Sequence, residues 1–247
     1  MSRRDTSLDA APVAARGRPA RSPFESARAK SWARAVVQMS GLSLRALDRH
    51  CQAAGSGQWS KYVAGRVSPT TEKLDIVEAL VPGSSRCYLS PLWELLDPKA
   101  LGLFGPRKIY EWLDEPLRSK FCLPLSDIPL FWRVPEHIGA ELSSVMTLAF
   151  TYRQPFDVLA ALLGSTHEAI TTQNRERLAY TSVALWILSN RLYDDERMME
   201  GLWAALPERH IRAFARNTLG LVGELGVDAH LQEATRSIRE IQRNALS

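Results

Sequence analysis

Hydrophobic positions recur every three or four residues along most of this 247-residue chain, and no segment shows the strict alternation of a half-buried β-strand. From residue 26 onward, short amphipathic segments are separated by turns that contain glycine, serine or proline, a pattern that predicts helices. The first of them places Trp32, Val36 and Val37 together and should end at Gly41. The chain is therefore predicted to be all-α, with an N-terminal four-helix module followed by a C-terminal helical bundle.

Three more short helices should complete the module within residues 26–81. Ser43 precedes "LRALDRH" as an N-cap, and Thr70 or Thr71 does the same for "TTEKLDIVEALV". Between them lies "QWSKYVAG", whose large apolar side chains must share one face of a helix. The positions expected to face inward are Leu44, Leu47, Trp59, Tyr62, Val63, Leu74, Val77 and Leu80.

The rest of the chain divides into a linker and a second helical domain. Residues 82–105 are rich in proline and glycine, which predicts a linker with at most one short helix. Residues 106–247 read as an all-helical domain. The middle of the segment 175–193, from Val183 to Leu188, is apolar nearly all round, as in a helix at the centre of a bundle. Two later helices carry arginine stripes, which favour solvated faces over a clamp for phosphate or an acidic partner: Arg209, Arg212 and Arg216, then Arg236, Arg239 and Arg243.

Positive charge is concentrated near the N-terminus. Residues 1–90 hold 14 Lys and Arg against 7 Asp and Glu, whereas the remainder holds 17 against 20. Residues 1–25 are rich in alanine, arginine, proline and serine and are predicted to form a disordered basic tail. The basic third of the chain is therefore the candidate for a polyanionic partner.

Other chemistry is not indicated. Cys51, Cys87 and Cys122 fit neither a disulfide framework nor a zinc cluster, and the histidines show no paired ligand spacing. No glycine-rich phosphate loop is present, and no apolar run approaches the roughly 18–20 residues that span a bilayer. We expect a cytoplasmic protein with reduced thiols, no membrane partner, no catalytic residue, no metal site and no cofactor.

Residues 43–64 meet the demands of a unit that presents a helix to the major groove of DNA. These demands are two short helices, a tight turn, an apolar inner face on the second helix and small or polar residues on its outer face. Trp59 and Tyr62 would anchor the second helix. The residues left on or near the outside are Ser56, Gly57, Gln58, Ser60 and Lys61.

At these positions the sequence resembles the phage-repressor-like (XRE) helix-turn-helix family, over about residues 26–81. The matching pieces are "GLS" at Gly41–Ser43, Leu47, the turn "AAGSG", Trp59 with Tyr62, "GRVSPT" at Gly65–Thr70 and "LDIVEAL" at Leu74–Leu80. The chain departs from the family's pattern in three ways. Asp48 stands where the family favours a small alanine, the turn is one residue longer, and Val63 replaces a polar residue.

The resemblance implies a set of DNA-binding residues. Gln58 would read a base, because a glutamine amide can form a bidentate pair with adenine. Ser56, Ser60 and Lys61, with Gly57 between the first two, would contact phosphates or nearby bases. The DNA backbone would be held by Arg45, Arg66 and Lys73.

The leading hypothesis is a sequence-specific transcriptional regulator that reads double-stranded DNA with the helix at residues 56–64. A homodimer is expected, because one reading helix contacts only a few base pairs. The C-terminal domain would serve dimerisation, a protein partner or ligand sensing. Two alternatives remain open: a helical interaction adaptor or antitoxin-like partner whose helix-turn-helix is structural or binds protein, and an enzyme within the C-terminal bundle.

Overall fold

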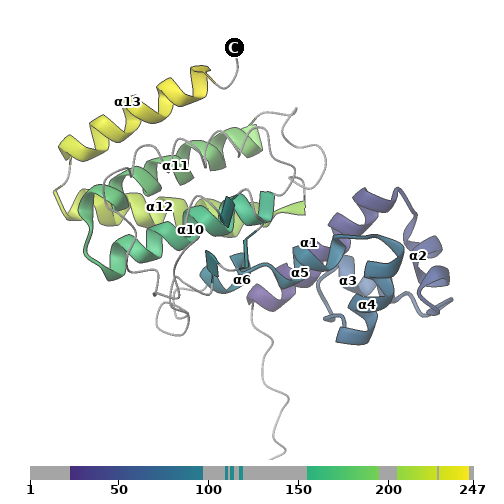
Figure 1. The fold of residues 1–247 in the computed structure, drawn as a ribbon. Helices are drawn as coiled ribbons and strands as arrows, with labels where there is room; N and C mark the ends of the chain where they lie inside the picture. Colours follow the sequence, from purple (N-terminus) through teal and green to yellow (C-terminus); the bar gives the residue numbers. More distant parts are fainter. Residues whose placement is uncertain are drawn as a thin grey trace, which may run out of the picture.

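The structure is a computed structural model of the chain. It describes residues 23–96, 109–110, 112–113, 117–118, 155–194, 205–226 and 228–244. Over these ranges the regular structure is helical and contains no strand, so the predicted all-α class is confirmed. Figure 1 shows helices α1–α4 at one end of the molecule, α10–α13 at the other, and α5 and α6 between them.

The first four helices begin and end close to the predicted positions. They are α1 (Pro23–Ser40), α2 (Leu44–His50), α3 (Gln58–Val63) and α4 (Thr71–Leu80). The prediction of a tail over residues 1–25 is wrong for its last three residues, which form the start of α1. Pro23 is compatible with this position, because the first turn of a helix does not use the N–H that proline lacks. Residues 1–22 lie outside the described residues.

Local capping explains where these helices start. Ser43 Oγ accepts the backbone N–H of Ala46 at 3.3 Å, and Thr70 Oγ1 accepts that of Lys73 at 3.2 Å. Both N-caps were predicted and are confirmed. After α1 the chain turns at Gly41, whose φ of +65° lies in the left-handed region that glycine occupies without strain.

An aromatic cluster forms the core of the N-terminal helices. Trp32 of α1 stacks on Trp59 of α3, with ring centroids 5.3 Å apart, and meets Tyr62 and Tyr88 edge-on. The inward positions predicted from periodicity are buried or pack against this core, except Leu80. Leu80 is 38% exposed because it is the last residue of α4.

Residues 82–96 hold two short helices, whereas the linker predicted for 82–105 allowed at most one, around Leu92–Leu96. They form α5 (Ser84–Leu89) and α6 (Leu92–Leu95), whose side chains Cys87, Leu92 and Trp93 are buried. Each of these helices begins directly after a glycine or a proline. Gly83, with a left-handed φ of +85°, is the N-cap of α5, and Pro91 is the N-cap of α6. Residues 97–105 lie outside the described residues.

Contacts from α5 and α6 join the two ends of the molecule. Arg86 Nε donates to Asp157 Oδ2 at 3.0 Å, and the Asp157 side chain is only 2% exposed. His167 Nε2 donates to the Leu95 carbonyl at 2.8 Å. One hydrophobic core runs from α1 through α5 and α6 into the C-terminal helices.

The C-terminal helices form a bundle around α11. They are α10 (Pro155–Thr171), α11 (Arg175–Asp194), α12 (Glu208–Glu224) and α13 (Asp228–Asn244). Helix α11 packs against each of the other three, as its all-round apolar pattern predicted. In the arginine stripes, Arg212 is half-buried and pairs with Glu208 at 3.0 Å, while Arg236 pairs with Glu233 at 2.9 Å.

We predict that Arg86→Ala lowers the free energy of unfolding by about 1.5–3 kcal/mol, because the buried Asp157 carboxylate loses its charged donor. Urea denaturation measures this change. Arg34→Ala is the matched control, since Arg34 is exposed on α1 and should shift the value by less than about 0.5 kcal/mol. Equal losses in the two variants would contradict the prediction.

A second prediction concerns pH. Burial lowers the pKa of His167, so between its folded pKa and the unfolded value of about 6.5 the unfolded chain binds more protons. The stability from neutral His167 is therefore complete above about pH 6.5 and falls as the pH drops toward the folded pKa.

Urea denaturation between about pH 7.5 and 5 checks this. His167→Gln keeps an N–H donor for Leu95 but does not titrate, so it should lose less stability on acidification than the wild type. Some pH dependence should remain, because burial and the nearby Arg209 lower the pKa of His210 as well. Identical slopes in variant and wild type would refute the role of His167.

Candidate nucleic-acid interface

Helix α3 is shorter than the predicted segment 56–64. It begins at Gln58, and its N-cap Gly57 has a φ of +59°, outside the helical region. Ser56 Oγ accepts the backbone N–H of Gln58 at 3.2 Å. Ser56 and Gly57 therefore lie in the turn before the helix, and the prediction that they are helical is wrong.

The two faces of α3 have different environments. Trp59 and Tyr62 are fully buried against α1 and α2, as expected of anchoring residues. Ser60 and Lys61 are exposed on the other side. Figure 1 places this helix at the end of the molecule away from α10–α13. A polar surface on a well-anchored helix is thus open to a partner.

Gln58, the predicted base reader, is turned onto its own helix. Its Nε2 donates to Tyr62 Oη at 2.7 Å, and its side chain is half-buried. Burial raises the pKa of Tyr62, although the bond from Gln58 counteracts part of that rise. To contact a base, the glutamine amide would have to leave this hydrogen bond. Residues four apart on a helix lie next to each other, so the sequence allows a contact between Gln58 and Tyr62. The spacing alone does not show that the glutamine amide binds Tyr62 rather than pointing into solvent.

Lys73, predicted to hold a phosphate, is engaged inside the protein. Its Nζ donates to the carbonyl oxygen of Cys51, the residue that ends α2, at 2.7 Å. A cation at this place is favourable because the carbonyl end of a helix carries partial negative charge. The lysine therefore ties α4 to the end of α2.

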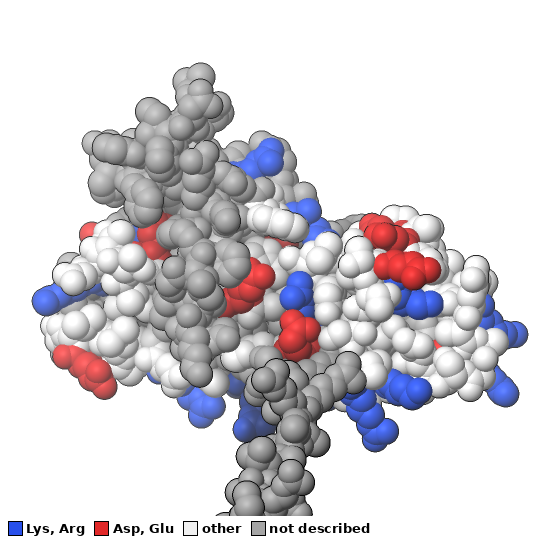
Figure 2. Space-filling model, turned by 90° about the horizontal axis from the view of Figure 1, so that it is seen from below, with Lys and Arg blue, Asp and Glu red and all other residues white. Residues whose placement is uncertain are grey.

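Several other basic side chains surround α3 at the surface. Arg45 and Arg66, both predicted to hold the DNA backbone, are exposed, and so is Arg49, one turn after Arg45 on α2. Figure 2 shows Lys and Arg spread over the end of the molecule that contains α2–α4, with acidic side chains gathered on one part of it. Glu72 and Asp75 of α4 are exposed acids of that end.

The first turn of α1 holds the loop that follows α3. Ser26 Oγ donates to the carbonyl of Gly65 at 2.8 Å, and Ser68 Oγ donates to Glu25 Oε2 at 3.2 Å. A side chain at Gly65 would place its Cβ 2.6 Å from Ser26 Oγ, and its φ of +68° also favours glycine. The neighbouring Phe24 meets His210 of α12 with ring centroids 5.4 Å apart. These contacts join distant parts of the sequence and could not be read from local patterns.

Asp48, where the family pattern expects alanine, contacts α3 directly. Its side chain lies in the interface of α2 and α3, and the residue is only 7% exposed. Oδ1 accepts the backbone N–H of Trp59 at 3.2 Å. The aspartate is therefore built into the junction of the two helices.

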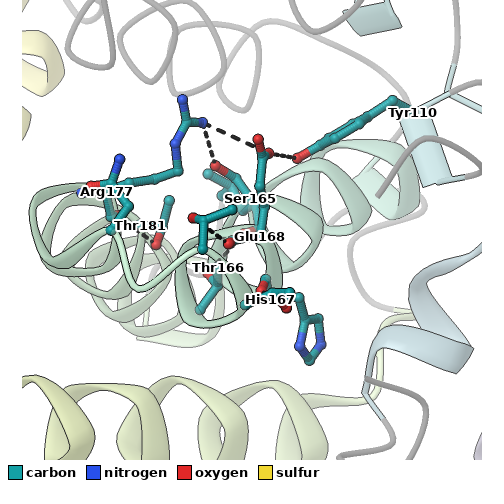
Figure 3. A network of polar contacts seen from close by, with 11 residues as sticks. Tyr110, Ser165, Thr166, His167, Glu168, Arg177 and Thr181 are labelled. Atoms are coloured by element: carbon teal, nitrogen blue, oxygen red, sulfur yellow. Dashed lines mark hydrogen bonds and ion pairs between the residues drawn. The ribbon is translucent and has the colours of Figure 1, made fainter. Parts of the chain in front are cut away.

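A separate polar network lies in the C-terminal bundle (Figure 3). Tyr110 Oη donates to Glu168 Oε2 at 2.7 Å, and Arg177 Nη1 donates to Ser165 Oγ at 3.2 Å and lies 3.9 Å from Glu168 Oε2. Arg177 thereby joins α11 to α10, and Tyr110 joins the segment at residues 109–110 to α10. Within the described ranges, no cluster of three or more His, Cys, Asp or Glu residues could hold a metal ion.

Comparison with known proteins gives no independent assignment. No family model, curated protein or solved structure matches the chain. Among the residues that the structure describes, no helix is long and apolar enough to cross a membrane.

Lys73 is bonded within the protein and Lys61 is exposed, and this difference leads to a stability prediction. Lys73→Met should lower the free energy of unfolding by about 1 kcal/mol, because the Cys51 carbonyl loses its donor. Lys61→Met is the control and should change it by less than about 0.5 kcal/mol, since Lys61 is exposed. Thermal and urea denaturation report both values. Lys73 would be an ordinary surface residue if the two variants proved equally stable.

Proposed function

We propose that this chain is a sequence-specific transcriptional regulator that reads double-stranded DNA with α3. The observation that carries the proposal is the division of α3 into a face anchored by Trp59 and Tyr62 and an exposed polar face with Ser60 and Lys61. A helix fits the major groove of B-DNA, which is about 12 Å wide. An anchored helix with short or polar outer residues can approach base edges at a defined angle.

Charge around α3 supports the same partner. Arg45, Arg49 and Arg66 are exposed on the segments before and after it. Arginines at such positions can bind phosphates and so fix the orientation of the protein on the duplex. Lys61 would reach base edges or the nearest phosphate. Ser56 and Ser60, which have short side chains, would contact phosphates or bases that lie close to α3.

The proposed regulator acts as a homodimer, because α3 contacts only a few base pairs and a two-fold assembly on a palindromic site doubles these contacts. The bundle of α10–α13 would supply the dimer contacts, or bind a protein partner or ligand. We place the protein in the cytoplasm, where a reducing environment suits the buried free thiols of Cys51 and Cys87.

Selection of bound fragments from genomic DNA by the purified protein tests the proposal. We expect a common sequence among the bound fragments, and a preference for it over a scrambled fragment that persists as the salt concentration rises. A double Ser60→Ala, Lys61→Ala variant should lose at least about tenfold of this preference, because direct base contacts carry the discrimination.

The control for this experiment is Arg239→Ala, which removes an exposed cation from α13 at the far end of the molecule. It should bind as the wild type does. Binding that vanishes equally for all fragments as salt rises would reject sequence-specific reading. A chain that selects no DNA but retains a protein partner would instead fit the interaction adaptor.

A further inference from the structure

A six-residue helix such as α3 needs help from its surroundings. Isolated helices shorter than about 12–15 residues are marginal in water, because the first turn fixes many dihedral angles for few hydrogen bonds. The first N–H groups of a helix also lack partners within the helix. The N-cap of α3 is Gly57, which has no side chain to accept any of them.

Two side chains outside α3 supply the missing acceptors. Ser56 Oγ accepts the N–H of Gln58, and Asp48 Oδ1 accepts that of Trp59. The serine is exposed and adjacent in sequence, so it can move with the helix. Asp48 belongs to a different helix and is buried, so its bond fixes α3 relative to α2. Its negative charge also suits the positive end of the α3 dipole.

The end of α2 that carries Asp48 is itself held in place. One turn after Asp48, the carbonyl of Cys51 accepts the Lys73 ammonium group from α4. The Cys51 side chain is buried in the same core. Asp48 is therefore on a helix end that α4 holds, and it binds the amide of the residue directly before the exposed Ser60 and Lys61.

We propose that Asp48 is a positioning residue for DNA reading: its carboxylate holds the first turn of α3 at the angle that gives the protein its sequence preference. This inference rests on the proposed function. Asp48 is buried and does not touch DNA itself; it acts through the Trp59 amide. At one of the three positions where the chain departs from the helix-turn-helix pattern, a tether would thus replace a small packing residue.

The test compares Asp48→Ala and Asp48→Asn with the wild type, using Asp75→Ala as the control for loss of an exposed carboxylate. The probes are the fragment selected by the wild type and a scrambled fragment of equal length. A second readout, hydrogen exchange of the Trp59 amide, needs no DNA. Circular dichroism establishes that each variant is folded.

Asp48→Ala should reduce the ratio of specific to non-specific affinity by about tenfold and speed exchange of the Trp59 amide by a similar factor. Its affinity for the scrambled fragment should stay unchanged, because exposed cations govern it. Asp48→Asn, which keeps an oxygen acceptor, should restore most of both properties. Asp75→Ala should behave as the wild type.

The outcomes separate the two proposals. If the wild type prefers a sequence and folded Asp48→Ala keeps that preference, the role of Asp48 is overturned while the proposed function stands. A wild type without any preference overturns the function itself. If Asp48→Ala does not fold, Asp48→Asn decides. Slow hydrogen exchange of the Trp59 amide together with a retained preference for the selected fragment supports the tether. Slow exchange together with a lost preference overturns it.

Discussion

The buried stack of Trp32 on Trp59 is the contact on which the N-terminal half depends. Aromatic pairs of this size contribute a large apolar area and a defined geometry, which a six-residue helix cannot obtain from its own hydrogen bonds. Tyr62 adds a second anchor one turn later. Because both anchors lie on one face, the opposite face of α3 does not pack against the core and can be polar.

The same core ties α3 to the rest of the protein. Trp32 also meets Tyr88 of α5, and α5 continues through the Arg86–Asp157 pair into the C-terminal bundle. The first turn of α1 adds a parallel connection, since Phe24 meets α12 while Ser26 holds the loop after α3. The proposed dimer contact or ligand in the bundle would therefore act on α3 through packed helices.

Periodicity and capping were sufficient to place most helices, because both depend on residues close in sequence: Ser43 and Thr70 cap where predicted. The linker prediction failed because proline and glycine content does not distinguish a loop from short helices that begin directly after these residues. Partners distant in sequence were not predictable either. The pattern singled out Asp48 and Lys73, but only the fold brings Trp59 and Cys51 to them. The proposed DNA contacts themselves stay predictions.

Gln58 illustrates how a side chain between the two faces could add selectivity in the proposed complex. Releasing its amide from Tyr62 would cost about 0.5–1.5 kcal/mol, the net value of a typical hydrogen bond. A good bidentate pair with adenine contributes about 1–3 kcal/mol of discrimination. Breaking the Gln58–Tyr62 hydrogen bond is then favourable where an adenine offers the bidentate pair and unfavourable at other bases. A glutamine held in this way would contribute little to non-specific binding.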